Sequence, residues 1–435
     1  METIVQVAQL LLALSILVGV HEGGHMVAAK AFGMKVEKFF IGFPPTLFSF
    51  KRGETEYGLG AIPLGGFVKI SGMIDESLDK EQMAAEPQPW EFRSKPAWQR
   101  LIVMLGGIIV NVITGVIAFV ILTYNVGETY YSSDYAKEYG FIAGPLAQEV
   151  GFQTGDKVMK VNGEDFERVT SIWSGETLLA SDAYWTVDRN GNTIDIPVPE
   201  GFLNNLEDDN FQLNFLQLRQ PFSVGEVAED KDIPLIANDV IVAVDSIPVT
   251  YYDEYRALKN ARAGQTVAMQ VLRDGQRLSL QVPIGADSIV GFRPDTPLEE
   301  SKNEYTFSEA LVRGTNKAFG MVVLNAKALG KMFSGDVNVR SLSGPIGIMK
   351  MYPKKWDWNQ FWYSTGFISM ILAFMNLLPI PALDGGHVVF LLFEMISGKA
   401  PSDKFLENAQ KVGMIILLGL MVFVFGNDIL KLFGL

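Results

Sequence analysis

The chain of 435 residues contains no cysteine and only three histidines. Without cysteine, neither a disulfide nor a thiolate metal site can form. Lys and Arg (36) are outnumbered by Asp and Glu (49), and the formal net charge of −13 disfavours nucleic acid as a partner. Charged residues are also absent from several long apolar stretches, and such an absence is typical of segments that cross a membrane.

Four such stretches predict transmembrane helices. Hydrophobic residues make up 48% of the chain, yet 20% of the residues are charged, and this mixture indicates membrane spans joined to a sizeable aqueous part. The predicted spans are Ile4–Val20, Leu101–Tyr124, Phe361–Leu383 and Val412–Phe425. The shorter apolar stretch Val388–Ile396 carries Glu394 and predicts an interfacial or partly buried helix.

The N-terminus has neither the basic region nor the cleavage site of a signal peptide, so we expect the first span to remain in the mature protein. Lys and Arg in segments 26–100 and 384–411 predict that these segments face the cytoplasm. The block 125–358 and both termini then lie outside, although Lys354 and Lys355 count against this orientation.

The segment between the first two spans predicts a β-hairpin or small sheet. Lys38–Phe50 and Tyr57–Ile70 flank the turn Arg52-Gly53-Glu54. Their high apolar content suggests that the hairpin dips into the membrane, where non-helical backbone must line a cavity. Residues 74–96 are polar and predict a surface segment.

The outer block contains an internal repeat. Gly155–Gly163 and Asn238–Ser246 each place an Asp before an alternating strand and a tight turn, and two further strands follow in each copy. Two related β-rich modules are the simple interpretation. After them, the periodicity of Phe307–Phe333 predicts an amphipathic helix that lies along the membrane surface.

Two of the three histidines form the run His21-Glu22-Gly23-Gly24-His25, directly after the first apolar stretch. On a helix, His-Glu-x-x-His puts both imidazoles on one face, where they can bind a zinc ion. Glu22 can then act as general base and later as proton donor. Ionisable groups are costly within a membrane, which favours this interpretation over a pair of buried, hydrogen-bonded histidines.

A catalytic zinc site usually has three protein ligands, so the motif needs one more. Asp384 is the candidate because it lies at the inner end of the third span, which runs parallel to the first. Two alternatives stay open: Asp384 as a helix cap or turn residue, and His387 as the third ligand.

Asn376, Pro379 and Pro381 interrupt the third span before Asp384. Proline breaks helices, so we expect an unwound segment whose free backbone groups can hold a peptide in extended form. The Asn376 amide can hydrogen bond to such a peptide; an ordinary proline kink with a packed Asn is the alternative. Asn111 is a weaker candidate, since the glycines before it favour helix packing.

Together these residues resemble the site-2 protease family of intramembrane zinc metalloproteases over nearly the whole chain. The family's His-Glu-x-x-His is His21–His25, its Asn-x-x-Pro-x-Pro-x-Leu-Asp-Gly motif is Asn376–Gly385, and the repeated modules match its two PDZ domains. Two family patterns are altered: Ile108 replaces the Pro of Gly-Pro-x-x-Asn, and Pro44 replaces the last Gly of Gly-Phe-Gly.

The resemblance implies one Zn2+ per chain, held by His21, His25 and Asp384, with Glu22 as the catalytic residue. It also implies that the 39–70 hairpin is a re-entrant element that pairs with substrate as an added strand. The substrate-binding residues are then expected to be Asn376, Pro379, Pro381, Gly65, Gly66 and Phe67.

The expected protein is a polytopic α-helical membrane protein with about four transmembrane helices, a re-entrant β element and two β-rich PDZ domains outside the membrane. The predicted domain order is 1–30 (helix 1), 31–96 (cytoplasmic-side loop with the β element), 97–125 (helix 2), 126–215 and 216–295 (PDZ domains), 296–356 (amphipathic segment), 357–387 (helix 3), 388–411 (short helix and loop) and 412–435 (helix 4).

The implied function is hydrolysis of transmembrane segments of single-span proteins in the bacterial inner membrane, such as anti-sigma factors and remnant signal peptides, in the control of envelope stress. The lipid bilayer is a further partner. The PDZ domains are expected to bind envelope-protein peptides or to exclude large substrates, although no clear Gly-Leu-Gly-Phe loop is present.

The alternative function is a non-catalytic PDZ scaffold with a structural zinc, which needs a closed site of four protein ligands. His387 would complete such a site. A transporter would carry inverted repeats among its spans, and the sequence shows none.

Overall fold

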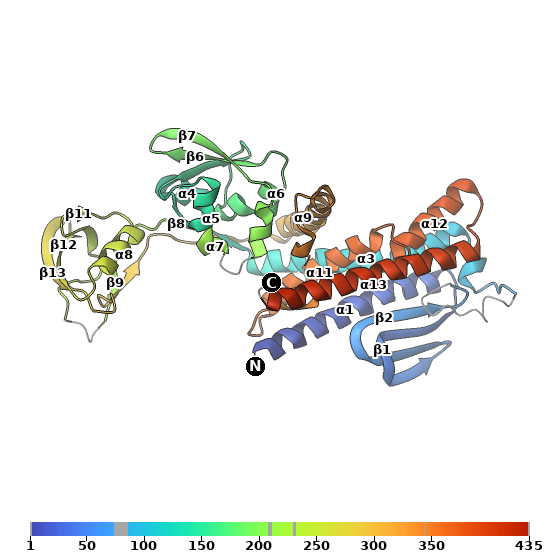
Figure 1. The fold of residues 1–435 in the computed structure, drawn as a ribbon. Helices are drawn as coiled ribbons and strands as arrows, with labels where there is room; N and C mark the ends of the chain where they lie inside the picture. The colour runs from blue at the N-terminus through green and yellow to red at the C-terminus, as the bar shows by residue number, and fades with distance from the viewer. Residues whose placement is uncertain (1, 74–85, 208–210, 229–231, 343, 434–435) are drawn as a thin grey trace. The chain divides into compact units, whose positions relative to one another are not determined.

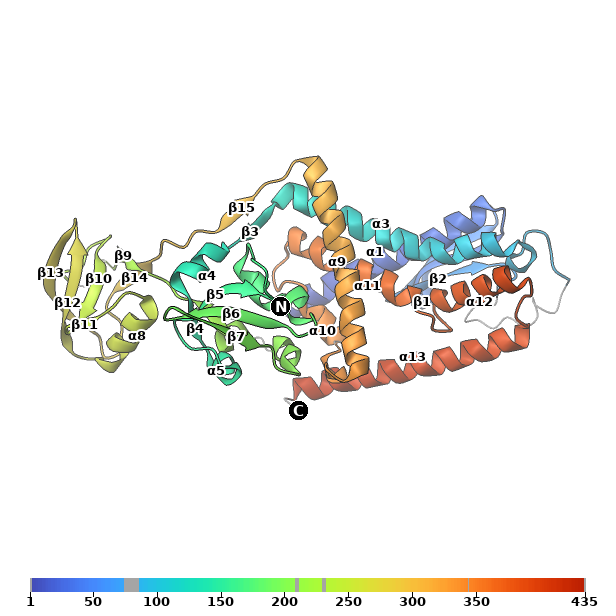
Figure 2. The ribbon, with the colours of Figure 1, turned by 90° about the horizontal axis from the view of Figure 1, so that it is seen from above.

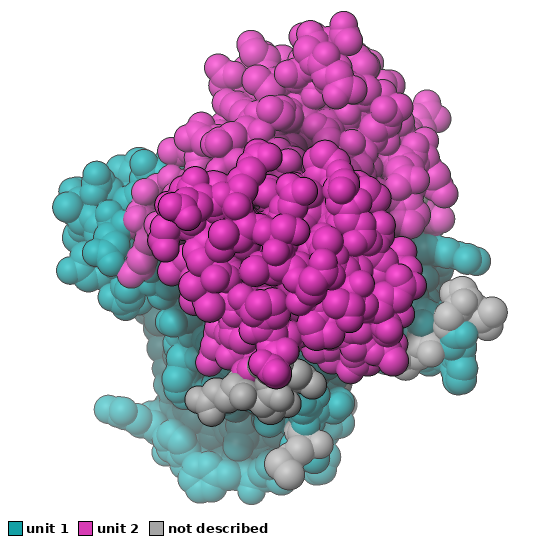
Figure 3. Space-filling view, turned by 90° about the vertical axis from the view of Figure 1, so that its left-hand side faces the viewer, with its two compact units in different colours: residues 1–127, 304–330, 339–435 teal, residues 128–303, 331–338 magenta. Residues whose placement is uncertain are grey.

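A computed structural model describes residues 2–73, 86–207, 211–228, 232–342 and 344–433. These residues form two compact units, coloured separately in Figure 3. The first comprises residues 1–127, 304–330 and 339–435, and the second comprises residues 128–303 and 331–338. Part of the predicted surface segment 74–96, namely 74–85, lies outside the described residues.

Two long helices, α1 (Glu2–Ala31) and α3 (Ala97–Val126), pack side by side in the first unit (Figures 1 and 2). α1 continues without a break from the first predicted span through the histidine motif. These two helices and Lys404–Lys431 of α13 (Asp403–Leu432) are the three described helices that are long and apolar enough to cross a membrane. Three of the four predicted spans thus coincide with such helices.

The third predicted span is not one continuous helix, which corrects the prediction for Phe361–Leu383. α11 (Trp358–Leu377) ends two residues before Pro379. Leu378 is extended because a residue that precedes proline is driven out of the helical region. The expected proline break is therefore present, and α11 is not among the three apolar helices named above.

A separate helix, α12 (Asp384–Ser397), follows the break and ends at Gly398, whose φ of 68° suits glycine. The sequence predicts that Asp384 lies at the inner end of the third span. In the structure, Asp384 is instead the first residue of α12. Val388 and Leu391 of α12 are buried in a core shared with α1 and α3. Two further α-helices are α9 (Phe307–Ser334), which matches the predicted amphipathic helix and lies mostly in this unit, and the short α10 (Pro345–Lys350).

The predicted hairpin is present as β1 (Val36–Arg52) and β2 (Thr55–Ile70). Each strand folds back on itself, so residues 38–41 pair with 66–69 on one side and with 56–59 on the other. Gly42, with a φ of 87°, permits the close crossing, because a Cβ there would lie 2.8 Å from the Gly60 carbonyl oxygen. Residues 66–69 consequently lie at an edge of this small sheet, next to α1.

The second unit contains two separate hydrophobic cores, each built on antiparallel strands. The elements around the first core are β4 (Phe141–Ala143), α4 (Ser133–Tyr139), α5 (Pro145–Val150), β5 (Lys157–Val161), α6 (Gly175–Leu178), β6 (Tyr184–Arg189), β7 (Asn192–Pro197), α7 (Phe211–Asn214) and β8 (Leu216–Leu218). β8 pairs with β4, so the first module extends beyond the predicted boundary at residue 215.

The second core lies among β9 (Ser223–Val227), β10 (Val240–Val244), β11 (Ile247–Pro248), α8 (Tyr252–Ala261), β12 (Thr266–Arg273), β13 (Gln276–Pro283) and β14 (Phe292–Asp295). β3 (Glu128–Tyr130) and β15 (Ser301–Asn303) pair where the chain enters and leaves the unit.

The same buried ion pair occurs in both modules. Asp156 binds the Arg189 guanidinium through both carboxylate oxygens, at 2.8 and 2.7 Å. Asp239 binds Arg273 in the same way, with both distances 2.7 Å. Burial alone would raise the pKa of Asp239, but the hydrogen bonds from Arg273 and from the Ile236 backbone, together with the charge of Arg273, lower it. The Asp of each predicted repeat thus has the same structural role.

Candidate metal centre and peptidase site

The histidine motif lies in the last third of α1, where the helical spacing places both imidazoles on one face. The Nε2 atoms of His21 and His25 are 3.2 Å apart. His25 is only 6% exposed. Glu22 points into the cavity that both histidines line.

Asp384, the first residue of α12, completes a group of three residues that can hold a metal ion. Its Oδ2 atom lies 3.1 Å from His21 Nε2 and 3.4 Å from His25 Nε2. A tetrahedral ion with ligand bonds of about 2.0–2.1 Å separates its ligands by about 3.3 Å. The three donor atoms therefore fit zinc in both chemistry and spacing.

The second nitrogen of each imidazole is held by α3. His25 Nδ1 lies 2.7 Å from the Val103 carbonyl oxygen and donates to it, which leaves Nε2 free to bind a metal. The Asn111 amide lies 3.1 Å from His21 Nδ1, and its Oδ1 is buried with no hydrogen-bond partner among the described residues. With the amide turned so that this oxygen accepts from Nδ1–H, both nitrogens of His21 are satisfied. Ser369 also donates to the Asn111 carbonyl oxygen, at 2.8 Å.

Glycines bring the backbone of α3 up to the motif. A Cβ on Gly106 would lie 2.7 Å from the Gly24 carbonyl oxygen, so α1 and α3 touch backbone to backbone there. A Cβ on Gly107 would lie 2.6 Å from His21 Cε1 and would also collide with the His25 ring. The sequence had suggested helix packing through these glycines; the structure adds that Gly107 makes room for the imidazoles.

A cavity of about 350 Å³ opens beside the three ligand candidates. Its walls are Glu22 of α1, Met104 of α3 and the hairpin residues Gly66, Phe67 and Val68. Val68 therefore lines the same cavity as the Glu22 carboxylate. An acid–base residue, a metal-binding group and the edge of a sheet therefore meet in one space.

Sequence comparison places this arrangement in a known family. The sequence profile of peptidase family M50 matches residues 9–420. The chain belongs to peptidase family M50. The match covers nearly the whole chain and confirms the resemblance to site-2 proteases.

Named relatives agree with this membership. The regulator of sigma-E protease RseP of Escherichia coli (strain K12) is 30% identical over 458 residues, which cover 98% of each chain. RseP of Salmonella typhimurium (strain 14028s / SGSC 2262) is 28% identical over 453 residues, again 98% of each chain. A Xylella fastidiosa (strain Temecula1 / ATCC 700964) protein whose name gives it as a zinc metalloprotease is 28% identical over 455 residues, 97% of this chain and 98% of its own. This M50 peptidase is a zinc metalloprotease of the membrane.

The other predicted site residues lie at different distances from the centre. Asn376 approaches it, with Nδ2 at 3.3 Å from His21 Nε2. Gly66 and Phe67 line the cavity, whereas Gly65 packs under the Phe43 ring. Pro379 and Pro381 lie in the break between α11 and α12 and do not line the cavity.

His387, the rival third ligand, lies one turn beyond Asp384 on α12. Among the described residues, the group that can hold a metal contains His21, His25 and Asp384 but not His387. The geometry therefore favours Asp384.

An ion pair that the sequence did not reveal fixes α12 against α3. Arg100, near the start of α3, binds the Glu394 carboxylate, and the two side chains are only 15% and 18% exposed. The Arg100 guanidinium also lies 6.0 Å from the Phe92 ring. Since Glu394 and Asp384 are on the same helix, this pair helps to fix the position at which Asp384 meets the histidines. The only sequence signal was a charged residue, Glu394, in an apolar stretch.

We expect Gly107→Ala to weaken zinc binding by about tenfold or more, because the added methyl group pushes both imidazoles out of place. The measurement is zinc retained per chain after dialysis against graded chelator. Gly419→Ala in α13 is the matched control, since nothing lies within 4 Å of a Cβ there, and helical Gly→Ala is otherwise stabilising. Equal zinc retention in the two variants would contradict this role of Gly107.

Reversing one charge of the Arg100–Glu394 pair should be costly. We expect Arg100→Glu to lower the free energy of unfolding by about 3 kcal/mol, because it leaves like charges in a poorly hydrated site. The double variant Arg100→Glu/Glu394→Arg should recover most of the thermal stability and zinc affinity. A double variant no better than the single one would show that the two residues do not act as a pair.

Proposed function

We propose that this protease cleaves peptide bonds within the transmembrane segments of single-span membrane proteins, using zinc held by His21, His25 and Asp384. The observation that carries the proposal is the convergence of these three side chains beside Glu22, in a cavity walled by a sheet edge. When bound, zinc supplies Lewis-acid chemistry, since it polarises a carbonyl group and makes water nucleophilic at neutral pH.

Glu22 is suited to move the protons of the reaction. It lines the cavity but is not part of the metal-binding group. Its carboxylate can accept a proton from the attacking water and then deliver it to the leaving amine. Val68 of the hairpin edge lines the cavity beside it. Asn376 is placed to contact the substrate backbone near His21.

The hairpin edge is suited to hold an unwound substrate. A transmembrane helix hides its amides in its own hydrogen bonds, so a protease must offer other partners to the amides that it frees. Residues 66–69 pair with β1 on one side, and among the described residues no further strand pairs with them on the other. A substrate segment can therefore add to this edge as a new strand, with Gly66 and Phe67 beside it.

The position of the motif along α1 agrees with cleavage inside the membrane. His21 and His25 are ten and six residues from Ala31, where α1 ends. At 1.5 Å per residue, this places them about 9–15 Å from the end of the helix, well within a hydrocarbon layer about 30 Å thick.

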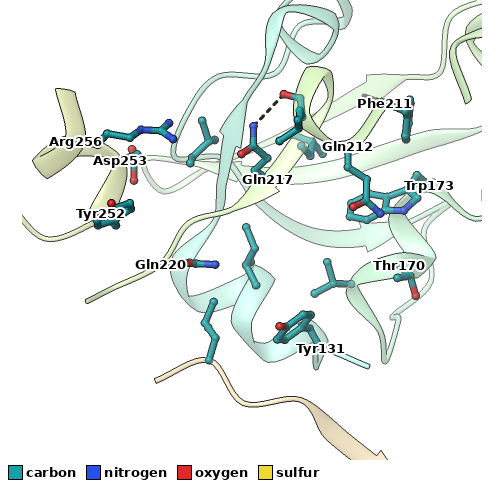
Figure 4. Close-up of a pocket in the computed structure, with 16 residues that line it drawn as sticks. Tyr131, Thr170, Trp173, Phe211, Gln212, Gln217, Gln220, Tyr252, Asp253 and Arg256 are labelled. Atoms are coloured by element: carbon teal, nitrogen blue, oxygen red, sulfur yellow. Dashed lines mark hydrogen bonds between the residues drawn. The ribbon is translucent and has the colours of Figure 1, made fainter. Parts of the chain in front are cut away.

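For the modules of the second unit we propose PDZ domains that bind peptides of envelope proteins or exclude large substrates. A cavity of about 940 Å³ is lined by β8 and by Val169, Thr170 and Trp173 of the first module, and by α8 residues of the second (Figure 4). PDZ domains recognise a peptide by adding it as a strand to a sheet edge, and β8 lies in the wall of this cavity. The RseP relatives are named as regulators of sigma-E, which suggests anti-sigma factors and remnant signal peptides as substrates. We propose that the protein lies in the bacterial inner membrane, with its peptidase site toward the cytoplasm.

The scaffold alternative is less well supported. A structural zinc site is closed by four protein ligands. Within the part of the chain that the structure describes, three side chains form the metal-binding group, and a cavity lies open beside them.

The test is cleavage of a single-span substrate, tagged at both ends, by the purified protein in detergent. We expect a cut within the apolar segment, loss of cleavage with a zinc chelator, and recovery when zinc is restored. Cleavage that resists the chelator, or that maps outside the apolar segment, would refute the proposal.

A further inference from the structure

A second cavity in the first unit plays no part in the peptidase site. It has a volume of about 380 Å³ and is formed by the end of α1, the turn between β1 and β2, and the loop before α3. The lining residues that matter are Lys30, Lys35, Arg52, Glu54, Thr55 and Trp90.

The walls of this cavity are fixed by hydrogen bonds between the three segments. Lys35 N donates to the Trp90 carbonyl oxygen at 3.0 Å, which joins the loop before α3 to the start of β1. Thr55, which is fully buried, donates from Oγ1 to the Val36 carbonyl oxygen at 2.8 Å. The basic side chains therefore extend from a defined frame.

The cavity has an excess of positive charge. Lys30, Lys35 and Arg52 line it, against the single carboxylate of Glu54. Lys95 also reaches it, since its Nζ lies 3.9 Å from the position of a Cβ on Gly33, another lining residue. Lys30 donates to the Tyr57 hydroxyl at 3.0 Å. Lys35, Arg52 and Lys95 form no ion pair with any described residue.

The cavity lies where two membrane helices end. α1 ends at Ala31 and α3 begins at Ala97, and both helices are apolar enough to cross a membrane. Trp90 and Trp98 are 47% and 48% exposed at this level, and tryptophan gathers where lipid headgroups meet the hydrocarbon. With α1 and α3 across a bilayer, the positive cavity would be level with the phosphate groups of the lipids.

We propose that this cavity binds the headgroup of an anionic phospholipid. Its phosphate would pair with Lys35, Arg52 and Lys95, which form no ion pair with the residues that the structure describes. Arg52 is at the turn of the hairpin whose edge lines the peptidase cavity. A lipid bound here ties that turn to the ends of α1 and α3 and so steadies the hairpin.

The test measures the rise in thermal unfolding temperature of the detergent-solubilised full chain as phosphatidylglycerol, phosphatidylcholine or soluble glycerol 3-phosphate is added. The variant is Lys35→Gln/Arg52→Gln. The control is Lys399→Gln/Lys404→Gln, which removes the same charge at two exposed positions away from the cavity. Unfolding of each variant without lipid shows that it is folded.

We expect phosphatidylglycerol alone to stabilise the protein, with an apparent affinity at least tenfold weaker for the cavity variant and changed less than threefold for the control. Equal losses in both variants would show general charge attraction and overturn the proposal. Equal stabilisation by phosphatidylcholine, or by glycerol 3-phosphate, would overturn it as well, because the site would then recognise either any lipid or a soluble anion.

Discussion

Glu22→Gln is expected to abolish cleavage of a transmembrane substrate and to leave the fold and the zinc content unchanged. Glutamine keeps the size and shape of the side chain but cannot accept a proton. General acid–base catalysis contributes about 10²–10⁴-fold to a rate, so we expect at least that loss in kcat. Because Glu22 lines the cavity without joining the three metal-binding side chains, its replacement should not release the ion.

The measurement is single-turnover cleavage of a purified single-span substrate, together with zinc per chain and thermal unfolding of the same samples. Glu2→Gln is the matched control, since Glu2 is an exposed residue of the same helix, 64% accessible and paired with Lys354. Full activity in the Glu22 variant would contradict the assignment of Glu22 as the residue that transfers protons. Loss of zinc in that variant would instead place Glu22 among the ligands.

Replacement of Asp384 should cause the second large change, a loss of zinc affinity. We expect Asp384→Asn to weaken zinc binding by more than about 100-fold, beyond the 10–100-fold typical of residues that only support a ligand. Its carboxylate contacts both imidazoles, at 3.1 and 3.4 Å. An amide keeps the volume but is a much poorer zinc ligand. Activity should fall in parallel and should return in part at high zinc concentration.

His387→Asn is the partner experiment, one turn further along α12. It should change zinc affinity by less than tenfold, because His387 is outside the metal-binding group. If both variants lost zinc equally, the site would have four protein ligands, and the structural-zinc scaffold would become the better description. Competition between a zinc-binding inhibitor and substrate would check this result independently, since a closed site has no position for an inhibitor.

Much of the site could be predicted from the sequence because its candidate residues lie in short sequence motifs. His21, Glu22 and His25 are so close in the chain that a helix alone determines their arrangement. Pro379 predicts the break in the third span, because the residue before a proline is disfavoured in a helix. The hairpin was equally local, since its turn and apolar strands are adjacent in sequence.

Other features depend on contacts between distant segments. The sequence predicts Asp384 as the third zinc ligand, but its place as the first residue of α12 follows only from the structure. No local pattern predicts that Asn111 and Val103 of α3 hold the two imidazoles, or that Arg100 reaches Glu394. The sequence predicts a module boundary between residues 215 and 216, and only the pairing of β8 with β4 shows that residues 216–218 pack with the first module.

The amino-acid sequence by itself determined that this protein has apolar helices and a zinc-binding helix motif, because helix periodicity, hydropathy and proline act over a few residues. Only the tertiary structure decided which side chains surround the metal position, which sheet edge faces it and where basic side chains gather around a cavity. Those relations arise when packing brings together residues that are far apart in the sequence, as where the backbones of α1 and α3 meet at Gly24 and Gly106.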